Sequence, residues 1–362
     1  MSTTTPARLS PHTPRPGAVF PLRPLAQDEL FKAAFTVIRR CPRAVLGLPL
    51  AAAVVNLGVA VLLLAASPGD AYLRMLTDPM AFENEEMLLA ALSEGGVLLL
   101  MVTGFVISGL AWAVSVGLLA IPVLRAAYGL PTSLRQTVGL RARRLGWLLL
   151  HLLVVVTALL LVGALAVAAG VLLTVVTLGF GLLVALPALF LLLCWLTAGL
   201  MFGPLLTVVE GRNAFSAIGR SFTLNRGMWW RHIGAVALLY LMLVVVLVVT
   251  ALPATLVTEL GSELAWRSDP EQSEVLVLVV LGLGQLYDLV LNTLLVALIG
   301  TLISVMYLNA RFRREALDVM LKHLAPQPAQ TEAEAAKLDT VLPGSPEHLR
   351  HSPRPPLPGA RR

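Results

Sequence analysis

The sequence predicts an all-α membrane protein with six transmembrane helices in three repeated units, each preceded by a short interfacial amphipathic helix. Three observations predict this fold: an apolar composition, six long apolar runs, and a concentration of lysine and arginine in some of the segments outside those runs. Of the 362 residues, 57% are hydrophobic and 13% are charged, and the mean hydropathy is +0.82. A chain of this composition is too apolar for a single soluble core, so we interpret it as an integral membrane protein.

Six apolar runs are long enough to cross a hydrocarbon core of about 30 Å as helices. They lie at about 44–66, 96–124, 146–176, 182–209, 233–257 and 280–308. The third and fourth runs are separated by only 177–181, so these two helices are predicted to form an antiparallel hairpin, with Gly163, Ala166 and Gly170 allowing close approach. The last run belongs to a 34-residue apolar stretch, 275–308, which is longer than a bilayer requires. We expect it to kink at Gly282 or Gly284, or to protrude from the membrane.

The segments outside the spans divide into tails, surface helices and loops. Residues 1–27 and the Pro-rich residues 326–362 have too little apolar content to fold and are predicted to be disordered, which leaves 28–325 as the membrane domain. Residues 28–40 carry apolar side chains at helical spacing and basic ones opposite, the pattern of an interfacial helix. The two cysteines, Cys41 and Cys194, lack the spacing of a disulfide framework and are interpreted as free thiols.

Charge placement predicts the orientation of the chain. Of the 27 lysines and arginines, 25 lie before residue 44, within 125–145, within 210–231 or after 308, whereas 11 of the 21 acids lie in the loops 67–94 and 258–274. By the positive-inside rule, both termini are predicted to be cytoplasmic, in a multi-pass protein of the bacterial cytoplasmic membrane, and the acidic loops are predicted to face outward. No apolar stretch of signal-peptide type precedes the first span.

The same plan repeats within the chain. A shift of 82 residues superposes Gly117 on Gly199 and Pro122 on Pro204, as well as Gly129, Arg144 and Trp147 on Gly211, Arg226 and Trp229. A looser third copy begins at residue 28. Such spacing indicates a duplicated unit of one surface helix and two spans.

Two further surface segments, 125–145 and 210–231, are each predicted to contain a short helix, and the one at 210–231 combines basic and aromatic side chains next to a span. Five of its residues are candidate contacts to lipid phosphates or to the membrane interface: Arg220, Arg226, Arg231, Trp229 and Trp230. The alternative is that the arginines act only as topology signals. The basic inner face is expected to meet anionic lipid headgroups, and no fold or aromatic platform for nucleic acid is recognisable.

A candidate structural motif closes the membrane domain. It consists of Glu210, Tyr307, Arg311, Arg313, Glu315 and Asp318. On a helix, Arg311 and Glu315 are four residues apart and can pair, which leaves Arg313 free for another group. We expect Glu210, at the inner end of the fourth span, to pair with Arg313 or Arg311.

Two stretches carry a resemblance to a known family. They are Glu210-Gly211 with Arg220-Ser221-Phe222, Leu224, Arg226-Gly227 and Trp230, and the run from Tyr307 to Asp318. Over about 22–321, the chain resembles the membrane domain found fused to some bacterial glycerophosphoryl diester phosphodiesterases and found alone in actinobacterial proteins of unknown function. Asn309 and Ala316 stand where that pattern has an aspartate and a glycine. The resemblance implies six spans and no activity, since the soluble phosphodiesterase domain is absent from this sequence.

A search for chemistry within the sequence gives one intramembrane candidate. Asp288 is the one acid inside a predicted span, and Gln285 and Asn292 lie on the same helical face. Such a group either marks a binding site or pathway within the bundle or, if this long segment protrudes, is merely solvated. No zinc, phosphate-loop or nucleophile-elbow motif occurs, and the six histidines are dispersed. We therefore expect no metal, no cofactor and no enzymatic activity.

The function predicted from these observations is a membrane scaffold in envelope processes that binds lipids or a protein partner. A small-molecule or lipid transporter is the first alternative, and a membrane-embedded enzyme is the second. A transporter requires polar groups from several spans to converge within the membrane. Homo-oligomerisation also remains open.

Overall fold

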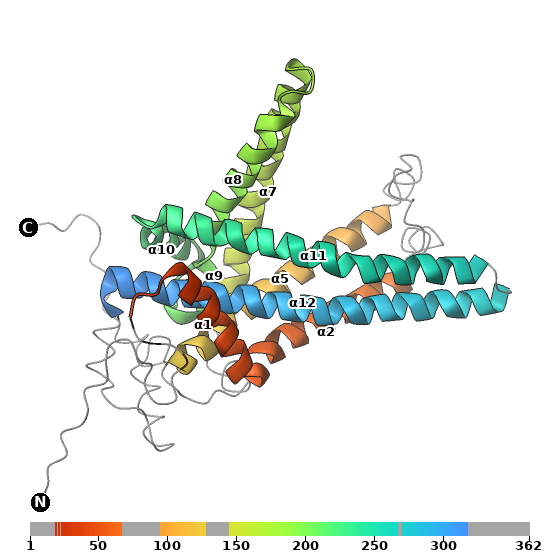
Figure 1. The fold of residues 1–362 in the computed structure, drawn as a ribbon, viewed down its shortest axis with the longest axis horizontal. Helices are drawn as coiled ribbons and strands as arrows, with labels where there is room; N and C mark the ends of the chain where they lie inside the picture. Colours follow the sequence, from red (N-terminus) through yellow and green to blue (C-terminus); the bar gives the residue numbers. More distant parts are fainter. Residues whose placement is uncertain are drawn as a thin grey trace, which may run out of the picture. The chain divides into compact units, whose positions relative to one another are not determined.

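The computed structural model defines residues 19, 21, 23–66, 95–127, 145–266 and 270–317, and these contain helices and connecting turns without a β-strand. In chain order the helices are α1 (Gln27–Arg40), α2 (Pro42–Ala66), α5 (Gly95–Ala127), α7 (Leu145–Val176), α8 (Leu182–Leu200), α9 (Gly203–Val209), α10 (Ala214–Asn225), α11 (Trp229–Trp266) and α12 (Pro270–Glu315) (Figure 1).

Six stretches of these helices are long and apolar enough to cross a membrane, which confirms the predicted all-α membrane fold. They are Pro42–Val59, Val102–Ala127, Gly146–Val176, Leu182–Val209, Trp229–Ala251 and Gly282–Glu315. The predicted surface helices at 28–40 and within 210–231 correspond to α1 and α10. The surface helix predicted within 125–145 falls largely outside the described residues. The predicted outer loop 67–94, the tail 326–362 and most of 1–27 lie outside them as well.

The second acidic segment, 258–274, differs from the predicted loop. Helix α11 continues to Trp266, and α12 begins at Pro270, so most of the segment is helical. Proline fits the first turn of a helix, where its missing N–H is not needed. Gly282 and Gly284 do not interrupt α12, which is one continuous helix of 46 residues.

The chain forms two compact units. Each of four helices has one part of its length in the first unit and the rest in the second: α2, α5, α11 and α12. Of the described residues, the first unit contains those within 1–45, 116–236 and 298–317, and the second contains those within 46–115 and 237–297. In the second unit, the Tyr287 hydroxyl donates a hydrogen bond of 2.7 Å to the Thr250 carbonyl and so joins α12 to α11.

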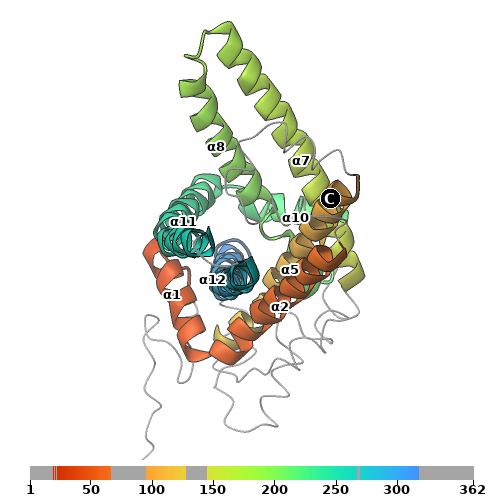
Figure 2. The same cartoon turned by 90° about the vertical axis from the view of Figure 1, so that its right-hand side faces the viewer.

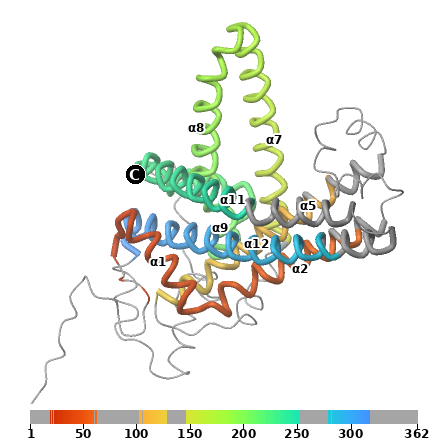
Figure 3. Tube along the Cα trace, turned by 45° about the vertical axis from the view of Figure 1, so that its right-hand side comes forward, coloured from red at the N-terminus to blue at the C-terminus, as the bar shows by residue number. Residues whose placement is uncertain are grey.

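Helices α7 and α8 of the first unit form the predicted antiparallel hairpin (Figure 3). Its turn uses positive backbone φ angles at Leu178 (52°) and Gly179 (98°), and the Thr177 hydroxyl accepts a 2.6 Å hydrogen bond from the Gly181 amide. A Cβ at Gly170 would lie 3.4 Å from the Ala185 Cβ, so the helices do approach closely there. Gly163 has no such neighbour within 4 Å.

The fourth span is interrupted where α8 gives way to α9. Met201 and Phe202 form a turn that ends the regular hydrogen bonding of α8, so carbonyl groups at the end of this helix can accept from other donors. Side chains of α10 supply them. Ser221 Oγ donates to the Gly199 carbonyl at 2.6 Å, and Asn225 Nδ2 donates to the Ala198 carbonyl at 2.7 Å. These two hydrogen bonds hold α10 against the end of α8, where the helix of the fourth span is interrupted.

Helix α1 is held against the same unit, along the start of α11 (Figure 2). Its apolar side chains Leu30, Ala33, Ala34 and Val37 are buried. Gln27 Nε2 donates to the Arg231 carbonyl at 2.8 Å, and the Leu25 amide donates to Asn309 Oδ1 at 2.8 Å. Both cysteines are free thiols, as predicted.

Candidate functional site

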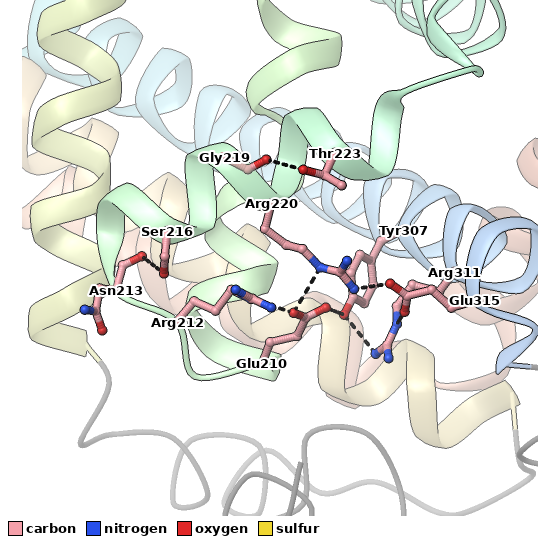
Figure 4. A network of polar contacts seen from close by, with 10 residues as sticks. All are labelled: Glu210, Arg212, Asn213, Ser216, Gly219, Arg220, Thr223, Tyr307, Arg311 and Glu315. Carbon is pink, nitrogen blue, oxygen red and sulfur yellow. Dashed lines mark hydrogen bonds and ion pairs between the residues drawn. The ribbon is translucent and has the colours of Figure 1, made fainter. Parts of the chain in front are cut away.

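Glu210 lies at the centre of a group of charged and polar side chains that joins the α9–α10 connection to the end of α12 (Figure 4). Gly211, with a φ of 67°, turns the chain directly after it, a conformation that glycine adopts without strain. We call the group the Glu210 cluster: Glu210, Arg212, Arg220, Tyr307, Arg311 and Glu315.

Two arginines of the cluster bind the Glu210 carboxylate directly. Arg212 Nε lies 2.8 Å and Arg220 Nε lies 3.4 Å from Glu210 Oε2. Arg220 also pairs with Glu315 across the cluster. The Glu210 side chain is 14% exposed and the Arg220 side chain 19%, so these ion pairs are shielded from water more than ordinary surface pairs.

Tyr307 links Glu210 to Arg311, which in turn pairs with Glu315. This fully buried side chain donates its hydroxyl to Glu210 Oε1 at 3.1 Å and accepts a hydrogen bond of 3.2 Å from Arg311 Nη1. Arg311 also stands over the tyrosine ring, with 5.7 Å between its Cζ atom and the ring centroid, which is within the range of a cation–π contact. Its Nε binds Glu315 Oε2 at 2.9 Å, as the four-residue spacing predicted.

The charges around Glu210 and Arg220 keep both side chains ionised. Burial alone would raise the pKa of Glu210, but Arg311, Arg220 and Arg212 outweigh it and hold that pKa below its usual value of 4.5. Burial likewise opposes the charge on Arg220, yet Glu210 and Glu315 raise its pKa. Each charged group of the cluster has an opposite charge beside it. This arrangement suits a structural link better than a reactive site, since its one hydroxyl is fully buried.

Arg313 does not take the predicted place beside Glu210. Its Nη2 instead donates to the Leu25 carbonyl at 2.7 Å and ties the end of α12 to the segment before α1. Arg311 meets the expectation in part: it lies close enough to Glu210 to stabilise the carboxylate, but it reaches the carboxylate through the Tyr307 hydroxyl.

A second set of arginines has no acidic partner among the residues that the structure describes. We call Arg226, Arg231, Arg313 and Arg314 the arginine patch. Arg314 donates to the Arg226 carbonyl. Arg313 donates to the Leu25 carbonyl, and the Arg231 carbonyl accepts from Gln27, so both arginines lie beside the segment that leads into α1. All four residues are exposed. Uncompensated like charges held side by side form an anion-binding surface.

The two neighbouring tryptophans of the predicted interface, Trp229 and Trp230, have different surroundings in the structure. Trp230 is 82% exposed and is free to contact lipid. Trp229 stacks on Trp195, with 5.5 Å between centroids and 15° between planes, and also contacts Phe222. A Cβ at Gly199 would lie 2.9 Å from Phe222, so the repeated glycine makes room for this aromatic packing.

The intramembrane candidates Gln285, Asp288 and Asn292 all lie exposed on α12 in the second unit. Asn292 faces a cavity that it shares with Asn56 and Ser108. Asp318 lies outside the described residues.

Sequence reasoning missed one buried polar group. His232 Nδ1 bonds Asn225 Oδ1, while the Asn225 amide nitrogen donates to the carbonyl groups of Ala198 and Ser221. Since Nδ2 is fixed as the donor, Oδ1 accepts, and the proton of this bond belongs to the histidine. Polar residues on the inner face of a surface helix, opposite a proline in a span, are the signal that points to such a group.

No family model, no curated protein and no solved structure matches this chain. Among the described residues, no three histidine, cysteine, aspartate or glutamate side chains converge as metal ligands.

Proposed function

We propose that this integral membrane protein binds anionic phospholipids through the arginine patch and acts as a lipid-binding scaffold in the bacterial cytoplasmic membrane. The observation that carries the proposal is the division of arginines into two sets. Arg212, Arg220 and Arg311 are neutralised by Glu210 and Glu315. The four arginines of the patch, by contrast, are exposed and have no carboxylate partner in the described part of the chain.

The position of the arginine patch at the ends of two candidate spans supports a lipid headgroup as its ligand. Arg231 lies three residues into the candidate span that begins at Trp229, and Arg313 and Arg314 lie at the end of the span that closes at Glu315. Charged side chains at the ends of spans lie at the depth of the lipid phosphates. The exposed Trp230 ring is adjacent, as in an interfacial anchor.

The orientation is part of the proposal. With both termini in the cytoplasm, the patch faces the inner leaflet, where anionic lipids attract each arginine by about 1 kcal/mol. We also propose that the chain is a relative of the phosphodiesterase membrane domains that it resembles, and that this membrane domain has no catalytic activity of its own. The fully paired Glu210 cluster then serves to hold the patch in shape, because α10 and α12 both contribute to it.

The test compares two double variants that each remove two positive charges. Arg231→Gln with Arg313→Gln disrupts the patch, whereas Arg39→Gln with Arg40→Gln removes exposed charges from the last turn of α1. Each protein is purified in mild detergent with equal amounts of phosphatidylglycerol and phosphatidylcholine, and retained lipid is measured by native mass spectrometry. The patch variant should lose about 2 kcal/mol of selectivity for phosphatidylglycerol, which is about a thirtyfold change in the lipid ratio.

The α1 variant should retain the wild-type ratio within about twofold, because its arginines are not part of the arginine patch. Equal losses in both variants would mean that overall charge, and not the patch, attracts the lipid. An unchanged ratio in the patch variant would leave these arginines as topology signals only.

A further inference from the structure

Two arginines of the patch are held in place by backbone carbonyl groups on different sides of α12. Arg313 Nη2 donates to the Leu25 carbonyl at 2.7 Å, and Arg314 Nη1 donates to the Arg226 carbonyl. Consecutive residues of an α-helix point about 100° apart, so the two guanidinium groups diverge from the helix axis. The end of α12 therefore presents two fixed positive charges in two separate places.

Each fixed guanidinium lies beside a segment that carries a second arginine. Arg314 reaches the turn between α10 and α11, where a Cβ at Gly227 would lie 3.6 Å from its Nη1 atom. Arg313 binds the segment before α1, and the first residue of α1 donates to the Arg231 carbonyl at 2.8 Å. The arginine patch thus consists of two pairs, which we call the turn pair (Arg226 and Arg314) and the α1 pair (Arg231 and Arg313).

Both pairs keep most of their hydrogen-bond donors for a ligand. A guanidinium group carries five N–H donors in one plane, and the bond to a carbonyl group uses one of them in Arg313 and one in Arg314. The side chains of Arg226 and Arg231 make no hydrogen bond or ion pair within the described part of the chain. Phosphate oxygens fit this geometry, because arginine donates two parallel N–H bonds to them. Each pair is therefore suited to one phosphate.

A ligand with a single phosphate leaves half of the patch without a counter-charge. Phosphatidylglycerol has one phosphodiester with one negative charge, so it can compensate one pair while the other pair stays uncompensated. Cardiolipin has two phosphodiesters joined through one glycerol, and it carries one negative charge for each pair. A lipid with two linked phosphates therefore matches the division of the patch.

The position of the two pairs favours a lipid over a soluble bisphosphate. Arg231 lies near the start of the candidate span that begins at Trp229, and Arg313 and Arg314 lie at the end of the last candidate span. Trp230, which precedes Arg231, is 82% exposed and offers an apolar surface next to the charges. A headgroup bound at this depth leaves its acyl chains in the bilayer.

We propose that the arginine patch binds cardiolipin, with one phosphate on the turn pair and the other on the α1 pair. This inference rests on the proposed function, because it names the lipid that the same patch binds. One cardiolipin molecule is favoured over two lipids with one phosphate each, since its second phosphate binds in an intramolecular step. The bound lipid joins the turn before α11, the end of α12 and the segment before α1.

Competitive lipid binding to the purified chain in mild detergent tests the proposal. Lipid is dilute in detergent, so the gain from linking two phosphates is measurable there. Cardiolipin is offered against phosphatidylglycerol and, separately, against phosphatidic acid, whose charge lies on a single phosphomonoester. Bound lipid is counted by native mass spectrometry. At equal phosphate, cardiolipin should be retained about tenfold or more over either competitor.

Two variants that each remove two charges test the two pairs separately. Arg226→Gln with Arg314→Gln removes the turn pair, and Arg231→Gln with Arg313→Gln removes the α1 pair. Either variant should lower the preference for cardiolipin over phosphatidylglycerol to about twofold or less, because one remaining pair holds one phosphate. If total charge alone set the preference, each variant would keep half of its free energy, which is about threefold or more.

The control is Arg39→Gln with Arg40→Gln on α1, which should keep the wild-type preference because these arginines are not part of the patch. Gel filtration checks that each variant is folded. The competition between cardiolipin, phosphatidylglycerol and phosphatidic acid on the wild type tests the need for two phosphates even if a variant does not fold.

Four results would overturn the proposal. Equal retention of cardiolipin and phosphatidic acid by the wild type would mean that charge, and not a second phosphate, is recognised. A graded loss in both pair variants would mean the same. Loss of the preference in one pair variant only would place the whole headgroup at that pair. Wild-type protein that prefers phosphatidylglycerol over phosphatidylcholine but has no preference for cardiolipin would refute this inference and leave the proposed function intact, whereas no preference for any anionic lipid would refute both.

Discussion

The charge of Glu210 should contribute strongly to the stability of this protein, and Glu210→Gln tests it with little change in shape. The variant leaves Arg212, Arg220 and Arg311 with Glu315 as their one acidic partner in the cluster. Removing one partner of a buried ion pair costs about 3–5 kcal/mol, while exposed pairs contribute about 0–1 kcal/mol. The cluster's charged side chains are 12–27% exposed, so we expect a loss of about 2–3 kcal/mol.

The assay is unfolding by sodium dodecyl sulfate in mild-detergent micelles, followed by tryptophan fluorescence, with double-mutant cycles. Glu210→Gln and Arg220→Gln should be coupled by about 1–2 kcal/mol, because the two side chains are in contact. The matched control is Arg313→Gln, whose side chain binds Leu25 instead. Its effect should add to that of Glu210→Gln within about 0.5 kcal/mol. Coupling to Arg313 and none to Arg220 would refute the arrangement described here.

The same variant should remove a pH dependence. Because the pKa of folded Glu210 lies below 4.5, its ordinary value, the unfolded chain takes up this proton first as the pH falls. The contribution of Glu210 to stability is therefore fully present above about pH 4.5 and is lost as the pH falls through the lower, folded pKa. The difference in unfolding free energy between the wild type and Glu210→Gln should shrink over that range. A constant difference would show that the carboxylate is not stabilised by its charge.

Three further predictions concern backbone, packing and orientation. Ala316→Gly should stabilise the protein by about 0.5–1 kcal/mol, since a φ of 48° strains alanine at the end of α12 more than it strains glycine; no gain in the detergent titration would contradict this. Gly199→Ala should destabilise it by about 1–3 kcal/mol, because the new methyl group meets the Phe222 ring; a neutral result would mean that the ring moves freely. A cysteine introduced by Ser216→Cys, on the exposed face of α10, should escape an impermeant thiol reagent in intact cells but react after lysis, and labelling from outside would reverse the proposed topology.

Part of the Glu210 cluster could be predicted from the sequence alone. Helical spacing alone predicts the Arg311–Glu315 pair, because residues four apart share one helix face whatever the fold. The surface helix within 210–231 could also be predicted, since the amphipathic pattern that forms it depends on neighbours in the chain. Ala316, just after α12, adopts a positive φ of the kind that glycine favours.

The residues that contact Glu210 could not be predicted from the sequence. Arg313 and Arg311 are two residues apart on α12, and both are basic, so composition cannot separate them. The rotation of α12 against α9 and α10 decides that Tyr307 and Arg311 face Glu210 while Arg313 faces Leu25. The pairing of Arg220 with Glu315, 95 residues away, depends on the same packing.

The sequence by itself determined which segments enter the membrane, because a bilayer selects for apolar content and charge along each stretch, and these are local properties. It also determined the short hairpin between α7 and α8, because five residues leave no other path. Only the tertiary structure decided which arginines are neutralised, which tryptophan is buried, and that Asn56 meets Ser108 and Asn292 at one cavity. Those outcomes depend on which faces of distant helices come together, and many sequences with the same hydropathy are compatible with different pairings of faces.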